Sequence, residues 1–95
     1  MTAVICKVDL YLASIHSLKA KRSLLRKLIS RTQQKFSVVI NEVGCHDLLQ
    51  RAELGFSYVG NDGVLLNRLV DETVQYLDET GLVRTIGSEK EIVHL

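Results

Sequence analysis

Cysteine is scarce in this chain of 95 residues, which contains only Cys6 and Cys45. Two cysteines are too few for a disulfide framework, so we expect both thiols to be free in a reducing compartment. Long apolar runs are also missing. None approaches the ~20 residues of a membrane span, and the N-terminus lacks the basic segment of a secretory signal. We therefore predict a cytoplasmic protein with no membrane partner.

Clusters of metal-binding or catalytic residues are absent as well. Cys45 and His46 are adjacent rather than spaced, which suits zinc chelation poorly, and His16 and His94 stand alone. No residue pattern orients a base toward a nucleophile. Small acylphosphatases place a glycine-rich loop with an arginine after the first strand, but residues 13–17 contain neither residue type. The sequence thus favours a non-enzymatic protein without a metal or a cofactor.

What is present is the composition of an ordinary folded domain. Hydrophobic residues make up 46% of the chain and charged residues 24%, with no low-complexity stretch. A chain of this length can bury one hydrophobic core but not two. Residues 1–95 are accordingly predicted to form a single domain.

Hydrophobic periodicity predicts four strands and two helices. Apolar residues alternate with period two over the first segment, whereas two longer segments place apolar side chains at helical spacing. The predicted elements are a strand over 3–12, a helix from Ser17 to Phe36, a strand over 37–43, a helical turn over 47–52, a strand over 54–59, a helix capped by Asn61-Asp62 and ended by Gly81, and a strand over 82–95 bulged at Gly87-Ser88.

The order β-α-β-β-α-β restricts the topology. Each βαβ half crosses over right-handedly, which places both helices on one face of the sheet. The predicted fold is α+β and ferredoxin-like. It is a four-stranded antiparallel sheet with its first and third strands in the centre and with one face left open.

Charge is distributed unevenly between the two halves of the chain. Residues 1–41 contain eight Lys and Arg and one acid, whereas residues 42–95 contain four Lys and Arg and ten acids. A helix N-terminus carries partial positive charge, so cations near the start of the first helix are unfavourable. Lys19, Lys21 and Arg22 occupy these positions, which indicates an anionic partner.

The basic residues of the first helix recur at helical spacing. Lys19, Arg22 and Arg26 follow at i, i+3 and i+7, as one stripe that suits a phosphate backbone. The predicted nucleic-acid-binding residues are Lys19, Lys21, Arg22 and Arg26, with Arg51 assisting from the loop between the second and third strands. A solvated basic face, or ion pairs with acids of the second helix, would explain the same charges.

The third strand, Leu54 to Val59, is loosely similar to the strand of RNA-recognition motifs whose aromatic side chains stack on bases. In one phase of this strand, Phe56 and Tyr58 lie on the open sheet face together with Tyr11. The opposite phase is compatible with the same alternation. An open apolar face is also typical of a contact between protein molecules, so a homodimer or another protein-interaction module is the alternative function.

Several short stretches span nearly the whole chain in a characteristic order: Ser17-Leu18-Lys19-Ala20-Lys21-Arg22, Phe36-Ser37-Val38, Glu42-Val43-Gly44, Asp47-Leu48, Gln50-Arg51-Ala52, Leu54-Gly55 and Asn61-Asp62. Together they resemble the YlxP-like family of small bacterial proteins of unknown function. The resemblance implies a ferredoxin-like fold. Genes of this family often lie near those for translation-initiation and ribosome-maturation factors, which implies a link to RNA. We predict a non-enzymatic RNA- or ribosome-associated protein that binds structured RNA through its first helix.

Overall fold

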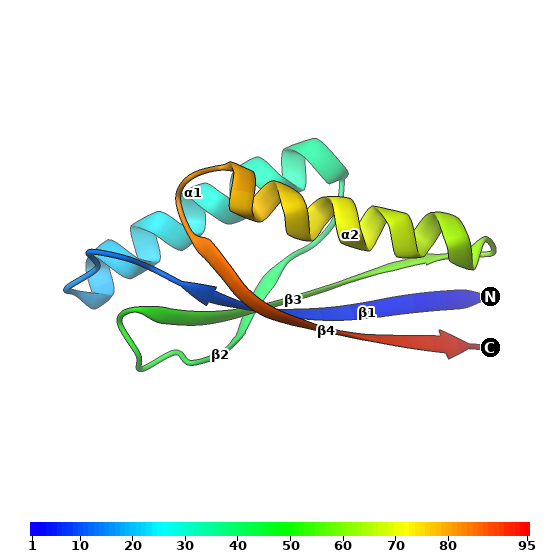
Figure 1. The fold of residues 1–95 in the computed structure, drawn as a ribbon, viewed down its shortest axis with the longest axis horizontal. Helices are drawn as coiled ribbons and strands as arrows, with labels where there is room; N and C mark the ends of the chain where they lie inside the picture. The colour runs from blue at the N-terminus through cyan, green and yellow to red at the C-terminus, as the bar shows by residue number, and fades with distance from the viewer.

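The computed structural model describes residues 1–95 as two layers, a twisted sheet and a pair of helices over one of its faces (Figure 1). The elements are β1 (Thr2–Tyr11), α1 (Leu18–Phe36), β2 (Asn41–Gly44), β3 (Arg51–Gly60), α2 (Gly63–Glu79) and β4 (Arg84–His94). All strand pairs are antiparallel, in the order β2-β3-β1-β4. The predicted α+β fold, with the first and third strands in the centre, is confirmed.

The core lies between the helices and the even-numbered residues of β1. Val4, Val8 and Leu10 are completely buried there, as the alternation of β1 predicts. Leu28 of α1 and Leu77 of α2 close over the sheet and are equally buried. Burying such a side chain stabilises a fold by roughly 1.5–3 kcal/mol, so the contact between the two layers is the main source of stability.

The ends of the helices follow from residues that favour capping. The Ser17 hydroxyl accepts the N–H of Ala20 at 3.1 Å, and Asp62 Oδ1 accepts the N–H of Val64 at 3.1 Å. Gly81, just after α2, has a φ of 73°, a left-handed conformation that glycine adopts without steric cost. Figure 1 shows that α1 starts at the end of the molecule opposite the two chain termini.

The segment between the two helices differs from the prediction. β2 has only four residues instead of spanning 37–43, because Ser37, with a φ of 51°, still belongs to the end of α1 and donates its N–H back to that helix. Residues 45–50 form a loop, so the predicted helical turn over 47–52 was wrong. Lys21 binds two carbonyl groups of this loop, which favours the irregular backbone over a helical one.

The irregularity of β4 is displaced from the predicted Gly87-Ser88 to Ile86. Asp9 and Leu10 are adjacent in β1, but their partners in β4 are two residues apart, which leaves Ile86 as the extra residue. Such an insertion bends one strand and locally disrupts its pairing. Neither helix of the fold is at once long enough and apolar enough to cross a membrane.

The phase of β3 is opposite to the one that would expose its aromatic residues. Phe56 is only 5% exposed beneath the helices, and the hydroxyl of Tyr58 hydrogen-bonds that of Thr73 in α2 at 2.7 Å. The prediction that Phe56 and Tyr58 line the open face was therefore wrong. Gly55 is on the open face instead, where a Cβ would lie 2.9 Å from Val43 Cγ1 on the neighbouring strand, so the position favours glycine.

Candidate nucleic-acid interface

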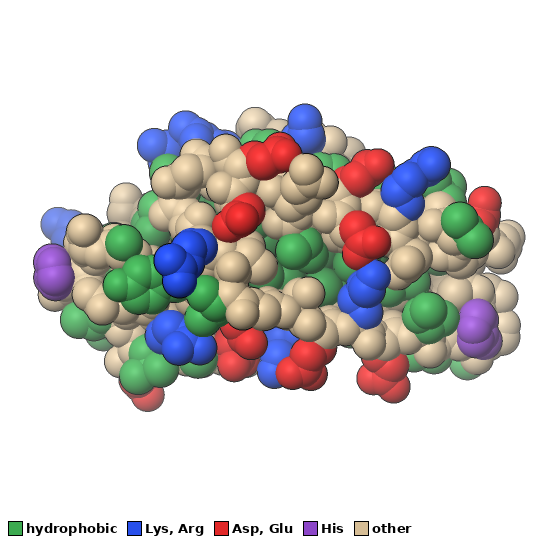
Figure 2. Space-filling model, in the orientation of Figure 1, with side chains coloured by type: hydrophobic (Ala, Val, Ile, Leu, Met, Phe, Trp, Pro, Cys, Tyr) green, Lys and Arg blue, Asp and Glu red, His purple; other side chains and the backbone are tan.

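Every charged side chain on the exposed face of α1 is basic. α1 contains seven Lys and Arg residues and no Asp or Glu. We define the α1 basic face as the six of these residues that are exposed to solvent: Lys19, Arg22, Arg26, Lys27, Arg31 and Lys35. No carboxylate lies within 4.0 Å of their charged nitrogens. Figure 2 shows Lys and Arg side chains along the upper edge of the molecule, where α1 lies, and carboxylates below them over α2.

The α1 basic face consists of two rows. Lys19, Arg22 and Arg26 form the row that their spacing predicts, and all three are exposed. A second row, at i, i+4 and i+8, is formed by Lys27, Arg31 and Lys35. This second row was not among the predicted binding residues, although the absence of any acid between residues 10 and 41 pointed to it. The last lysine of the row lies beside α2, with its Nζ 5.2 Å from the ring centroid of Tyr76.

Ion pairs with α2 do not account for the charges of α1. Each acid of α2 has a partner elsewhere: Asp71 pairs with Lys90 at 2.7 Å, Glu72 with Arg68 at 3.9 Å, Asp78 accepts the N–H of Thr85 at 2.8 Å, and Glu79 accepts the side-chain amide of Gln75 at 3.0 Å. These contacts lie within α2 or between α2 and β4. The explanation by interhelical ion pairs is therefore wrong, and solvation or an external partner remains.

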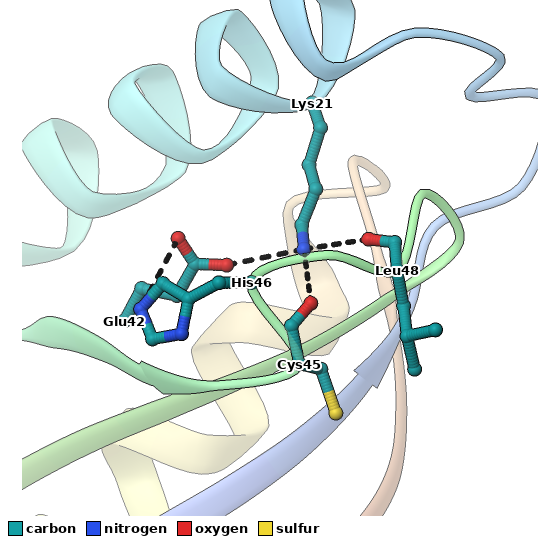
Figure 3. Close-up of polar contacts among 5 residues, drawn as sticks. All are labelled: Lys21, Glu42, Cys45, His46 and Leu48. Carbon is teal, nitrogen blue, oxygen red and sulfur yellow. Dashed lines mark hydrogen bonds and ion pairs between the residues drawn. The ribbon is translucent and has the colours of Figure 1, made fainter.

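Lys21 is the remaining cation of α1, and it is not part of the exposed basic face. Its side chain is only 3% exposed. The Nζ atom donates to the carbonyl oxygens of Cys45 and Leu48, each at 2.7 Å (Figure 3). Glu42 Oε2 lies 3.1 Å from Nζ and neutralises the charge, although the angles at this contact do not satisfy those of a hydrogen bond. The prediction that Lys21 contacts phosphates is thus corrected.

The position of Lys21 in the sequence indicates that its side chain is buried. Lys21 precedes Leu25, Leu28 and Thr32 at helical spacing, and all three of those residues are buried. A cation on the buried stripe of a helix requires a partner inside the fold, because an unpaired buried charge is costly. Lys21 therefore ties the first turns of α1 to the loop after β2, which holds the start of the basic face in place.

Arg51 is on the other side of the sheet from α1. It pairs with Tyr11 in the register of β3 and β1, and Tyr11 pairs in turn with Arg84 of β4. The Arg84 Cζ atom lies 5.7 Å from the ring centroid of Tyr11. Arg51 therefore does not extend the α1 basic face but belongs to a separate set of residues. Arg84 was missed because cross-strand register cannot be read from the sequence.

The structure brings no catalytic or metal-binding group together at the basic face. No three His, Cys, Asp or Glu side chains are placed so that they could hold a metal ion. Cys6 and Cys45 are both free. Burial raises the pKa of the Cys6 thiol from 9.0 to about 11, so this thiol stays protonated and unreactive at neutral pH. Electrostatic attraction of an anion is what the arrangement can provide.

Three comparisons place the chain among known proteins. A family model described as a protein of unknown function, DUF503, matches residues 3–90. The uncharacterized protein YlxP of Bacillus subtilis (strain 168) is 33% identical over 73 residues, which cover 77% of this chain and 77% of the relative. Among solved structures, the structural-genomics protein YJCS matches 97% of this chain and 99% of its own, with a TM-score of 0.59 and 12% identity, which shows the fold alone. The chain therefore belongs to the YlxP-like family of proteins of unknown function, DUF503.

Proposed function

We propose that the protein is a non-enzymatic, cytoplasmic RNA-binding protein that holds the phosphate backbone of structured RNA, such as ribosomal RNA, on the α1 basic face. One observation carries the proposal: six exposed cations on one helix lack any carboxylate within 4.0 Å. Nearby acids exist on α2, but they have other partners. The cations are therefore available to phosphates.

The length of the basic face suits an extended polyanion. The cations extend from Lys19 to Lys35, which at ~1.5 Å per residue corresponds to about 24 Å along the helix axis. Lys and Arg side chains that neutralise phosphates release condensed counterions, which makes the binding strongly dependent on salt. Phosphate contacts position a protein without reading bases, so we expect little sequence preference.

The test is RNA binding measured by fluorescence anisotropy at several salt concentrations, with a blunt-ended RNA hairpin as the ligand. The double variant Arg22→Gln/Arg26→Gln should lower affinity and reduce the slope of log K against log salt by about one for each arginine. Arg68→Gln on α2 is the control for the loss of one exposed cation outside the basic face, and its effect is compared with the effect per arginine of the double variant. Wild-type binding without salt dependence, or an equal loss in both variants, would contradict the proposal.

A homodimer through the open sheet face is a second candidate function. The apolar residues exposed on this face are aliphatic, in place of the aromatic residues expected from the sequence. Ile5 is 47% exposed, Val39 71% and Val43 50%. These three side chains border one shallow hollow of the open face. Exposed apolar patches often mark contacts between proteins. Light scattering that finds a monomer at high concentration would exclude this candidate.

A further inference from the structure

One end of the open sheet face carries two arginines on either side of a tyrosine. Arg51 of β3, Tyr11 of β1 and Arg84 of β4 are direct cross-strand neighbours, so their side chains are on the same side of the sheet. This side is the open one, because Leu10, the neighbour of Tyr11 in β1, is completely buried beneath the helices. We call Arg51, Tyr11 and Arg84 the sheet-end rung.

The sheet-end rung presents two guanidinium groups and one aromatic ring that could contact a ligand. Arg51 and Arg84 are exposed, and neither has a carboxylate within 4.0 Å. The Arg84 guanidinium, 5.7 Å from the ring centroid of Tyr11, holds the half-buried ring in place. Proteins bind unpaired nucleotides by stacking the base on aromatic or guanidinium planes and by donating charge-assisted hydrogen bonds to the phosphate. The sheet-end rung presents both kinds of group.

A hollow beside the rung offers room for the base. It has a volume of about 240 Å³ and is bordered by Tyr11 and Arg84 together with Leu82 and Val83 of the turn before β4. A nucleobase has apolar faces and polar edges, so an apolar wall next to an aromatic ring suits stacking. The hollow and the guanidinium groups therefore fit the two parts of a nucleotide.

The next rung along the sheet limits the size of the ligand. Asp9 and Glu53 are direct neighbours there, on the same open side, and their outer partners are Gly87 and Gly44. Two adjacent carboxylates repel a phosphate, so a nucleic-acid strand cannot continue from the sheet-end rung across the open face. The rung thus suits one nucleotide at the edge of the sheet rather than a strand that lies along it.

The sheet-end rung lies near the start of the α1 basic face. β1 ends at Tyr11 and α1 begins at Leu18, and only the short loop 12–17 separates them. Figure 1 shows the end of β1 and the start of α1 toward the same end of the molecule, opposite the chain termini. A single strand that leaves an RNA helix held on α1 would pass around this end of the molecule to the rung on the opposite face of the sheet.

We infer that the sheet-end rung binds one unpaired nucleotide that flanks the RNA helix held by α1, with its phosphate at Arg51 and Arg84 and its base against Tyr11. This inference rests on the proposed function, since RNA is the ligand in both. Together the two surfaces select a junction between paired and unpaired RNA, which neither surface selects alone.

The experiment compares a blunt RNA hairpin with the same hairpin carrying a three-nucleotide overhang, at the 5′ or the 3′ end, by anisotropy at fixed salt. For wild type, one of the two overhangs should tighten binding by roughly tenfold, the usual effect of one stacked base. Tyr11→Leu should abolish this gain and leave affinity for the blunt hairpin unchanged. Tyr11→Phe, which keeps the ring, should retain the gain. Arg51→Gln, an exposed change that cannot disturb the core, should reduce it several-fold.

The outcomes separate the inference from the proposed function. If the blunt hairpin binds in a manner sensitive to Arg22→Gln/Arg26→Gln but neither overhang adds affinity, the inference is overturned and the function of α1 stands. If an overhang adds affinity that Tyr11→Leu and Arg51→Gln leave intact, the inference is overturned as well. If a single-stranded oligonucleotide binds through Tyr11 and the blunt hairpin does not bind, the function of α1 and the selection of a junction are overturned, and only nucleotide binding at the sheet-end rung is supported. If no RNA binds, both are overturned.

Discussion

α2 carries charges of both signs, and each of them has a polar partner inside the molecule, whereas only Lys21 of the seven cations of α1 pairs with a carboxylate. Both helices cover the same face of the same sheet, so the difference does not come from their place in the fold. α2 shows that this fold can compensate helix charges with neighbours from its own helix and from β4. The exposed cations of α1 are not compensated in this way.

The charges of α1 carry a cost in the free protein. Arg22 and Arg26, Lys27 and Arg31, and Arg31 and Lys35 are like-charged pairs at i, i+4, each unfavourable by roughly 0.2–0.5 kcal/mol. Cations in the first turn also oppose the helix dipole. A phosphate backbone would relieve both costs. The comparison with α2 therefore favours an anionic partner for α1.

The largest effect is expected at Lys21, the one cation of α1 that has partners inside the fold. Lys21→Met leaves the carbonyls of Cys45 and Leu48 without their donor and the carboxylate of Glu42 without its positive partner. Breaking a buried ion pair in this way should lower the free energy of unfolding by roughly 3 kcal/mol, measured by urea denaturation. Lys19→Met is the matched control, an exposed lysine two residues away, and should change stability by less than about 0.5 kcal/mol.

Binding should follow the opposite order for the same two lysines. Folded Lys21→Met should bind the blunt hairpin like wild type, whereas Lys19→Met should bind it more weakly. Equal stability of the two variants would show that the contacts of Lys21 contribute nothing. A loss of binding confined to Lys21→Met would show that the buried lysine, and not the exposed face, supports the interaction.

A smaller effect is expected at alkaline pH from Cys6, which lies in the core near Lys90 and Asp71. Its pKa is raised from 9.0 to about 11 by burial, so the folded protein holds the thiol proton more tightly than the unfolded chain. The corresponding stability is complete below pH 9 and is lost as the pH rises toward 11, in total roughly 2–3 kcal/mol. Urea midpoints measured between pH 8 and pH 11 should fall more steeply for wild type than for Cys6→Ala. Parallel curves would contradict this assignment.

The smallest effect on stability comes from giving α1 an acid like those of α2. Ser23→Glu places a carboxylate on the exposed face, four residues from both Lys19 and Lys27. It should raise the free energy of unfolding by about 0.5 kcal/mol, because it adds opposite-charge pairs at i, i+4 spacing with both lysines. The same change should weaken affinity for the RNA hairpin. A variant that is more stable and binds RNA as tightly as wild type would show that the basic face is only solvated.

The sequence was sufficient for the elements and their order, because these depend on local patterns. The alternation of β1, the apolar stripes of the helices and the caps at Ser17 and Asp62 act within a few residues of each other. The phase of β3 could not be derived in this way. Alternation places Phe56 and Gly55 on opposite faces but does not say which face is buried. The register with β1, which sets Phe56 opposite the buried Cys6, fixes this in the folded chain.

The candidate site, like the fold, could be predicted only where local spacing determines it. Arg22 and Arg26 are where helical spacing places them, since the exposed side of an amphipathic helix can be read from its apolar side. Lys21 was misassigned because its charge was given more weight than its position on the buried stripe. Arg84 depends on the register between β4 and β1, which a bulge shifts by one residue, so only the folded chain brings it next to Tyr11.

RNA binding by the α1 basic face can be mapped residue by residue in an amide chemical-shift titration of the ¹⁵N-labelled protein with the blunt RNA hairpin. If α1 binds the phosphate backbone, the largest shifts should fall on residues 18–36, with the side-chain resonances of Arg22 and Arg26 among them, and α2 should remain almost unchanged. The shifts should diminish as salt is raised, because counterion release drives the binding. Shifts centred on α2, or none on either helix, would contradict the account.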